Sequence, residues 1–404
     1  MLNLETQATT TSINPTFLSE TTPGAVRDVI DAVENKNSSQ IDTTLTRLIE
    51  QADDLGLPQG FLAESRRCLA SGNWQDFAHS LRSLSFVGED GRFLIVAPYT
   101  TSRKGKQETL LSAIYGSRLS LGEIPALRPI VEDIFGHVNE SIPSIVPVIR
   151  HSGAGWFAGE SGEAFIVPNG WPELPHGDGP VLNNMSEQLG RVAVAFEAIR
   201  TIFDEPSANL VLGAYTPQAR LMSTLHTEYS FHEAGHASGA GLSQKFASGV
   251  LNSPFYGSIE EWRSDGVAFE VARRALPAET VGTLVASNII TRFGIDAHRR
   301  GTIHLDTDVN SALLLFNSLL NSGMLKVYPD NSLGFVDPTY KGLARATEMM
   351  SASAIALTRQ EIQLPEPRAI WTLYPSAISV PDSVRKLFLQ TVVNPCLGFF
   401  RELR

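Results

Sequence analysis

A short run of residues near the middle of the chain combines two histidines and a glutamate at a spacing that suits metal binding. The run is His232-Glu233-Ala234-Gly235-His236. On a helix, residues four apart lie on the same face, so His232 and His236 can direct two imidazoles at one ion. Glu233 lies one residue further round, where it can reach a water molecule on the metal. We therefore predict a helical Zn²⁺ site with Glu233 as the general base.

A zinc site of this kind needs a third protein ligand, and a second acidic stretch follows at 260–265. Glu261 is the expected ligand because Asp265 comes one helical turn later and can accept the outer N–H of a ligand histidine. Glu260 is the alternative ligand. Ser258 and Glu261 also fit a capping box, in which Glu261 would serve the start of a helix instead of the metal.

Hydrolysis at such a site also needs a group that stabilises negative charge on the substrate oxygen. The sequence offers Tyr256, His298 and His304 as candidate catalytic residues and does not choose among them. It contains no phosphate-binding loop, no dinucleotide fingerprint and no Gly-x-Ser-x-Gly motif. Nucleotide chemistry and serine-hydrolase chemistry therefore have no support in the residues.

Composition narrows the class of protein. The chain has 404 residues, of which 43% are hydrophobic and 19% charged, and its net charge of −11 argues against a nucleic-acid partner. The two cysteines are too few for a disulfide framework. Residues 1–22 have neither the basic nor the apolar region of a secretion signal, and we find no apolar run of about 18 residues. We expect a cytoplasmic protein without membrane partners, and the oligomeric state stays open.

The hydrophobic pattern changes at Asp204-Glu205-Pro206. We predict a flexible tail over 1–22, an α+β lobe over 23–205 and a mainly helical, zinc-carrying lobe over 206–404. The first lobe is expected to contain a strand at 92–97, helices at 107–116, 125–139 and 186–203, an edge strand at 142–149, and a hairpin of 156–158 with 164–167. The second is expected to contain helices at 217–237, 258–276, 279–293, 309–322, 338–360 and 382–402, and a hairpin of 324–328 with 333–336.

The two motifs together resemble those of gluzincin zinc peptidases, and most of all the dipeptidyl peptidase III family. That family carries His-Glu-x-x-Gly-His-Gly-Ser-Gly and a later Glu-Glu-Cys-Arg-Ala-Glu, to which residues 232–239 and 260–265 correspond here. By this resemblance His232, His236 and Glu261 are the zinc ligands, Glu233 is the base, and Asp265 supports a ligand histidine. The metal motif here has five residues where that of the family has six, and the interval to the second motif is shorter.

The family also carries a catalytic histidine upstream of a Leu-Leu-x-x-Gly segment. Residues 319–323 fit that segment, and the resemblance therefore favours His304 over His298. It further implies an α+β, mainly helical fold: a two-lobed, zincin-like metallohydrolase with one helix for the histidine pair and a second for the third ligand.

The leading interpretation is a zinc-dependent peptidase that cleaves amide bonds of small peptides through metal-activated water. Two alternatives stay open. One is a zinc hydrolase that acts on an amide or ester in a small metabolite, and the other is a non-catalytic binding protein on the same scaffold.

Overall fold

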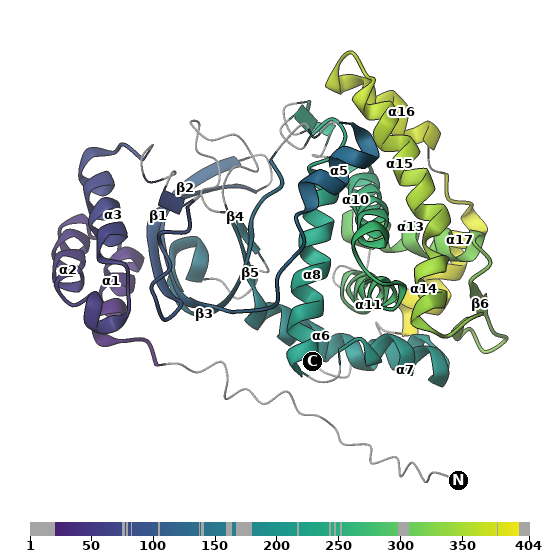
Figure 1. Cartoon of the computed structure of the whole chain (residues 1–404), viewed down its shortest axis with the longest axis horizontal. Helices are drawn as coiled ribbons and strands as arrows, with labels where there is room; N and C mark the ends of the chain where they lie inside the picture. The colour runs from purple at the N-terminus through teal and green to yellow at the C-terminus, as the bar shows by residue number, and fades with distance from the viewer. Residues whose placement is uncertain are drawn as a thin grey trace, which may run out of the picture.

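The computed structural model describes residues 21–74, 77, 80–81, 83–103, 106–136, 138, 141–158, 164–166, 180–215, 218–241, 244–245, 248–250, 253–297, 307–377 and 379–395. The protein is α+β and mainly helical. Helices near the N-terminus cover a curved sheet, and a larger assembly of helices lies on the other side of that sheet (Figure 1). The predicted lobe boundary at residues 205 and 206 stays a prediction.

The sheet has five strands in the order β1-β2-β3-β5-β4. Their bounds are β1 Arg92–Arg103, β2 Lys106–Arg118, β3 Ile145–Ala154, β4 Ala164–Ile166 and β5 Val181–Asn184. Neighbouring strands are antiparallel except for the parallel pair β3 and β5.

Three local predictions in this region are wrong. The segment 107–116 is not a helix but most of β2, which pairs with the whole length of β1. The segment 142–149 is not an edge strand, because β3 lies between β2 and β5. The expected hairpin is absent within the described residues, since 155–158 form a short 3₁₀ helix and β4 pairs with β5. In each case, pairing between strands that are distant in sequence outweighs the local sequence pattern.

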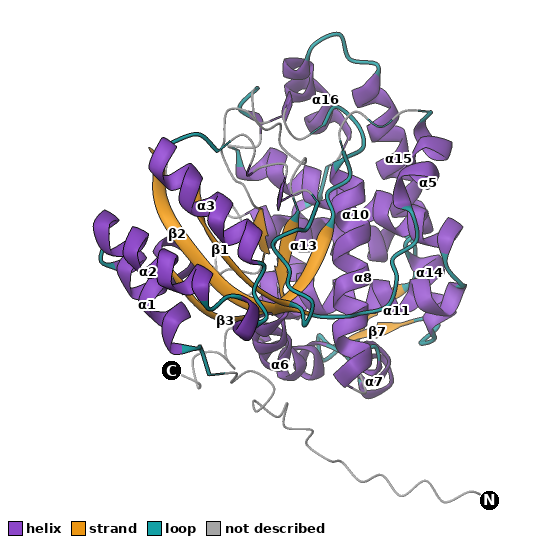
Figure 2. Cartoon of the chain, turned by 60° about the vertical axis from the view of Figure 1, so that its left-hand side comes forward, coloured by secondary structure: helices purple, strands orange, loops and turns teal. Residues whose placement is uncertain are grey.

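Both faces of the sheet are buried, which follows from the alternation of side chains along a strand. Leu94 and Val96 pack on the helical layer of α1 Gly24–Glu34, α2 Ser38–Glu50 and α3 Gln59–Ser71. Phe93 and Ile95 point to the opposite face, where Phe93 meets Phe86 edge-on at 5.6 Å between ring centroids. Figure 2 shows the helical layer lying across the curved strands.

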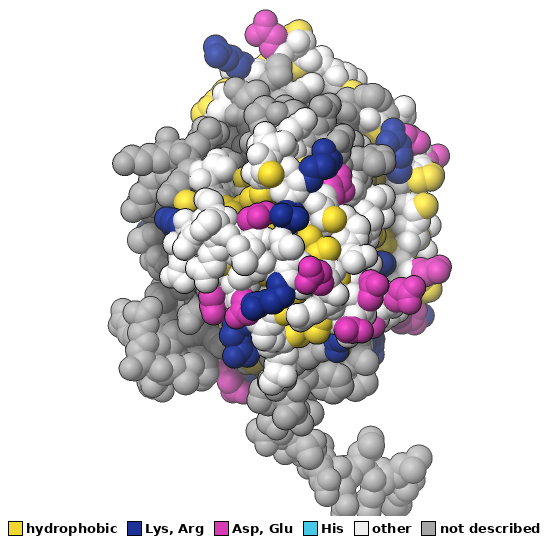
Figure 3. All heavy atoms as spheres, turned by 90° about the vertical axis from the view of Figure 1, so that its left-hand side faces the viewer, with side chains coloured by type: hydrophobic (Ala, Val, Ile, Leu, Met, Phe, Trp, Pro, Cys, Tyr) yellow, Lys and Arg dark blue, Asp and Glu magenta, His cyan; other side chains and the backbone are white. Residues whose placement is uncertain are grey.

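The outer surface of that helical layer mixes charges of both signs. Arg47 pairs with Asp28, and Arg66 pairs with Asp42 at 2.6 Å, all with largely exposed side chains. Basic side chains accordingly lie beside acidic ones on the face that Figure 3 presents. This surface is a solvated one whose ion pairs add little to stability.

The remaining helices share one large hydrophobic core that extends from Leu127 to Val393. They are α5 Leu127–Phe135, α6 Met185–Ile202, α7 Glu205–Gly213, α8 Gln218–His236, α10 Pro254–Ala275, α11 Ala278–Ile289, α13 Thr307–Asn321, α14 Tyr340–Ala346, α15 Glu348–Ile362, α16 Ile370–Ala377 and α17 Asp382–Phe388. π-Helical turns continue α11 over Ile290–Asp296 and α17 over Leu389–Val393. The hairpin of β6 Leu325–Val327 with β7 Leu333–Phe335 confirms the prediction for that stretch. None of the described helices has the length and apolar character needed to cross a bilayer.

Helices α8 and α10 carry the two motifs and lie unusually close together. A Cβ atom on Gly235 would fall 2.4 Å from the carbonyl oxygen of Ser264, so only glycine allows this approach. The Ser264 hydroxyl donates a hydrogen bond to the carbonyl of His232 on the facing helix. The sequence of α8 therefore fixes how near its histidines come to the acidic residues of α10.

Helix α10 is buried on nearly all sides, as expected of a helix in the middle of a helical layer. It begins at Pro254, one turn earlier than predicted. The capping-box interpretation is therefore wrong, because Ser258 lies inside the helix and its hydroxyl donates to the carbonyl of Pro254. Glu261 is thus free of any capping role and faces α8.

We predict that Gly235→Ala destabilises the protein by about 1–3 kcal/mol, the usual cost of forcing extra atoms into a packed contact. Gly190→Ala is the matched control, because a Cβ added to that helical glycine would have nothing within 4 Å of it. It should be neutral or stabilising by roughly 0.5–1 kcal/mol. Urea unfolding measures both. Equal effects of the two substitutions would show that the α8–α10 contact is looser than described.

Candidate metal centre

The two histidines of α8 and Glu261 of α10 bring their polar atoms to one point. The Nε2 atoms of His232 and His236 are 3.0 Å apart. A Glu261 oxygen lies 3.3 Å from the first and another lies 3.6 Å from the second. Within the described residues this is the one histidine and carboxylate group with all its ligand atoms inside 4.8 Å of one another, the separation that a single metal ion can span.

The outer nitrogens of both imidazoles contact carboxylates that are almost fully buried. The Nδ1 of His232 lies 2.8 Å from Asp265, and the Nδ1 of His236 lies 3.0 Å from Glu260. An ionised carboxylate only accepts, so each Nδ1 carries the proton and donates it. The Nε2 atoms of the two rings then face each other beside Glu261, where a bound metal ion would take the place of a proton on Nε2. Two imidazole nitrogens and a carboxylate that meet at one point are a donor set that fits zinc.

Glu260 is held by a buried network behind His236. Its Oε2 accepts from Lys245 at 2.6 Å and from the Tyr374 hydroxyl at 2.9 Å, and its Oε1 lies 2.5 Å from Arg263. Glu361 adds a second carboxylate, 2.9 Å from Lys245. The two acids and two bases are each at most 2% exposed, and their charges balance. Glu260, the alternative ligand predicted from the sequence, therefore lies behind His236.

A second network lies behind His232, and Arg292 is its centre. The guanidinium reaches Asp265 at 2.8 Å, Glu261 at 3.2 Å and Asp296 at 3.1 Å. Arg292 therefore ties the histidine's partner to the third ligand. Sequence reasoning missed this arginine, which comes from the π-helical end of α11, where no motif marks it.

The ionisable groups at the centre have strongly perturbed pKa values. Burial alone would lower the pKa of His232, but its hydrogen bonds to Asp265 and Glu261 hold that pKa well above the usual range. Burial would raise the pKa of Glu261, and the neighbouring histidines and Arg292 instead lower it. The surroundings thus keep Glu261 ionised and stabilise positive charge at the point where the three side chains meet.

The centre opens into a cavity of about 250 Å³. Glu233 lines it beside the two histidines, as the spacing of the motif predicts. Tyr229, also in the lining, hydrogen-bonds to Glu233, and burial raises the pKa of its phenol well above the ordinary value. Tyr229 is not among the residues predicted from the sequence, although its position one turn before Glu233 on the same helix is a usable signal.

Of the three residues predicted to stabilise the oxyanion, Tyr256 alone is among the described residues, and it lies away from this centre. Tyr256 does not line the cavity. Its hydroxyl donates to the carbonyl of Trp371 at 3.1 Å, and its ring lies against that tryptophan. His298 and His304 lie outside the residues that the structure describes. Within the described part of the cavity, Tyr229 is the phenol that faces the candidate base.

Comparison with known proteins places the chain in a family. Residues 18–273, more than half of the chain, match the model of a family of unknown function, DUF6014. The chain belongs to the DUF6014 family. A search of curated proteins gives no match. Among solved structures, DPP III from Caldithrix abyssi superposes with a TM-score of 0.62 at 14% identity, over 92% of this chain and 72% of that one. At this identity the likeness shows a shared fold: this DUF6014 member has a DPP III-like fold.

We predict that Glu260→Ala destabilises this DUF6014 protein by roughly 3–5 kcal/mol, because Lys245 and Arg263 would stay buried without their shared carboxylate. The control is Glu279→Ala, which breaks a pair with Lys341 at 3.1 Å between side chains that are both 61% exposed. That substitution should cause little change. Urea unfolding at neutral pH compares the two. A loss at Glu260 no larger than that at Glu279 would contradict the described network.

Proposed function

We propose that the protein is a zinc-dependent hydrolase of the gluzincin type that cleaves amide bonds, with small peptides as its substrates. The observation that carries the proposal is the convergence of His232 Nε2, His236 Nε2 and the Glu261 carboxylate. The Nδ1 atom of each ring donates a hydrogen bond to a buried carboxylate. Two imidazoles and a carboxylate are the donor set of a zinc site with an open position for water. The DPP III-like fold adds support of a coarser kind.

His232, His236 and Glu261 would hold the metal, and Asp265 and Glu260 would fix the two rings in the ligating tautomer. Zinc, when bound, supplies a Lewis acid that lowers the pKa of water to about 7. Glu233 takes the proton from the attacking water and transfers it to the leaving nitrogen.

Tyr229 assists this transfer in two ways. Its hydroxyl contacts the Glu233 carboxylate, and its raised pKa keeps the phenol protonated at neutral pH. A protonated phenol beside the base can orient that carboxylate through its single O–H, and the same O–H can turn to a substrate oxygen that gains negative charge once Glu233 has taken the proton from water. His298 and His304 remain proposed for the same task.

The size of the cavity bears on the substrate. A volume of about 250 Å³ suits one or two residues of a peptide or a compact metabolite. A small amide or ester in a metabolite is therefore the second candidate substrate. The cytoplasm remains the proposed compartment, on the ground that the chain has only two cysteines.

We expect Glu233→Gln to keep stoichiometric zinc and to lose at least about a hundredfold in turnover, since it keeps the shape of the base but cannot accept a proton. Glu261→Ala should instead lose zinc, because two imidazoles alone hold the metal weakly. Elemental analysis and hydrolysis of di- and tripeptide arylamides, beside small acyl amides and esters, measure both effects.

The two variants separate the roles of the residues. Normal turnover in Glu233→Gln would mean that another group activates the water. Full zinc retention in Glu261→Ala would remove that residue from the metal site. Turnover of the acyl amides or esters without turnover of peptides would favour the second candidate substrate.

A further inference from the structure

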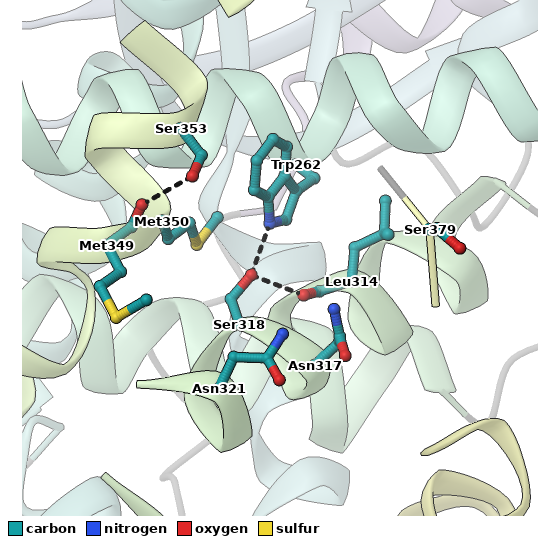
Figure 4. Close-up of a pocket in the computed structure, with 9 residues that line it drawn as sticks. All are labelled: Trp262, Leu314, Asn317, Ser318, Asn321, Met349, Met350, Ser353 and Ser379. Carbon is teal, nitrogen blue, oxygen red and sulfur yellow. Dashed lines mark hydrogen bonds between the residues drawn. The ribbon is translucent and has the colours of Figure 1, made fainter. Parts of the chain in front are cut away.

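A second cavity lies between α10, α13 and α15 and shares no described lining residue with the cavity at the metal centre (Figure 4). Its volume is about 210 Å³. Trp262 of α10 lines it, and the indole N–H donates to the hydroxyl of Ser318 on α13 at 3.0 Å. Trp262 follows Glu261 in the chain, whereas Glu261 turns to the histidines of α8. Helix α10 thus carries the proposed zinc ligand on one side and a wall of this cavity on another.

Helix α13 contributes a polar stripe to the cavity. Most of this helix is apolar and belongs to the large hydrophobic core. Asn317, Ser318 and Asn321 follow Leu314 at intervals of three, four and seven residues, so the four side chains share one face of the helix. All four line the cavity. Asparagine and serine are mediocre helix formers, and core packing gives no reason for them on this face.

Asn317 indicates that the cavity receives a hydrogen-bond donor. Its side chain is 8% exposed, and its Oδ1 is buried with no hydrogen-bond partner among the described residues. Most buried polar atoms in folded proteins are hydrogen-bonded, and an acceptor left unpaired costs free energy. A ligand with a donor group would recover that cost.

Two hydroxyl groups in the lining already use their only proton. Ser318 donates to the carbonyl of Leu314 at 2.8 Å, and Ser353 donates to the carbonyl of Met349 at 3.0 Å (Figure 4). Each hydroxyl oxygen keeps the capacity to accept. These two groups and Asn317 Oδ1 therefore match a ligand that brings N–H or O–H donors.

The rest of the described wall suits an aromatic ring. Trp262 supplies an indole, and Met349 and Met350 of α15 supply thioethers, whose sulfur atoms make favourable contacts with aromatic rings. Met350 is 2% exposed and Met349 is 56% exposed, so this part of the wall extends from the interior to the surface. A cavity of about 150 Å³ can hold benzene. The larger volume here has room for a ring system with two fused rings.

We propose that this cavity is a binding site for a small aromatic ligand that carries an N–H or O–H donor. The ring packs against Trp262 and Met350, and the donor bonds to Asn317 Oδ1. Binding at this site needs neither the metal nor hydrolysis, so the proposal is independent of the proposed function.

The test titrates indole and benzofuran into the zinc-loaded full-length protein and measures both affinities by NMR. The two probes have nearly the same shape, but benzofuran has an oxygen atom where indole has its N–H donor. Indole should bind with a Kd of about 1 mM or lower. Benzofuran should bind about three- to tenfold more weakly, the difference expected for one neutral hydrogen bond.

Three variants locate the bound probe. Asn317→Leu removes the acceptor, so it should weaken indole about three- to tenfold and make the two probes bind alike. Asn288→Leu is the matched control, because Asn288 lines the cavity at the metal centre, is 1% exposed and also has a buried Oδ1 without a partner among the described residues. It should leave both affinities unchanged. Ser353→Phe places a ring in the cavity from an exposed position of α15 and should abolish binding of both probes.

Several outcomes would overturn this site. They are no indole binding at millimolar concentration, equal binding of the two probes to the unmodified protein, and an undiminished preference for indole in Asn317→Leu. Undiminished binding in Ser353→Phe would also reject it, and this variant keeps the test valid if Asn317→Leu does not fold. A loss in Asn288→Leu as large as that in Asn317→Leu would place the probe at the metal centre instead.

Discussion

The site depends on two hydrogen bonds between imidazole Nδ1 atoms and buried carboxylates. Asp265 and Glu260 accept from His232 and His236, and in doing so they direct both Nε2 atoms at the same point. Burying a carboxylate costs free energy unless it is paired with a cation, and each of these two acids has such a partner. Arg292 forms an ion pair with Asp265, and Arg263 forms one with Glu260. The orientation of the two rings is therefore built into the helical core.

The fold supplies the geometry that these bonds require. Gly235 lets α8 approach α10 closely, and Ser264 links the two helices through the carbonyl of His232. The π-helical end of α11 brings Arg292 to the same place. On the far side, the balanced pairs around Glu361 anchor Glu260. Precision at the centre thus comes from helices packed against helices, and the sheet lies outside this arrangement.

Sequence reasoning succeeded where the information is local. Four-residue spacing was enough to place His232 and His236 together, and a single turn of helix was enough to relate Glu261 to Asp265. It failed where distant segments decide the outcome. Segment 107–116 has a helical pattern but becomes β2, because pairing with β1 outweighs its local preference. Glu260 could not be assigned from sequence, because its partners Lys245 and Tyr374 come from segments on either side of α10. Neither the family model nor the shared fold identifies a reaction, so the chemistry has to be inferred from the residues of the site.

Zinc K-edge X-ray absorption on the stoichiometrically loaded protein reports the ligand atoms themselves. We expect a low-coordinate shell of nitrogen and oxygen at about 2.0–2.2 Å, with outer scattering from two imidazole rings. Loss of one ring's signal in His236→Ala should follow. A sulfur shell near 2.3 Å, or a shell of oxygens with no imidazole scattering, would contradict a centre built from His232, His236 and Glu261.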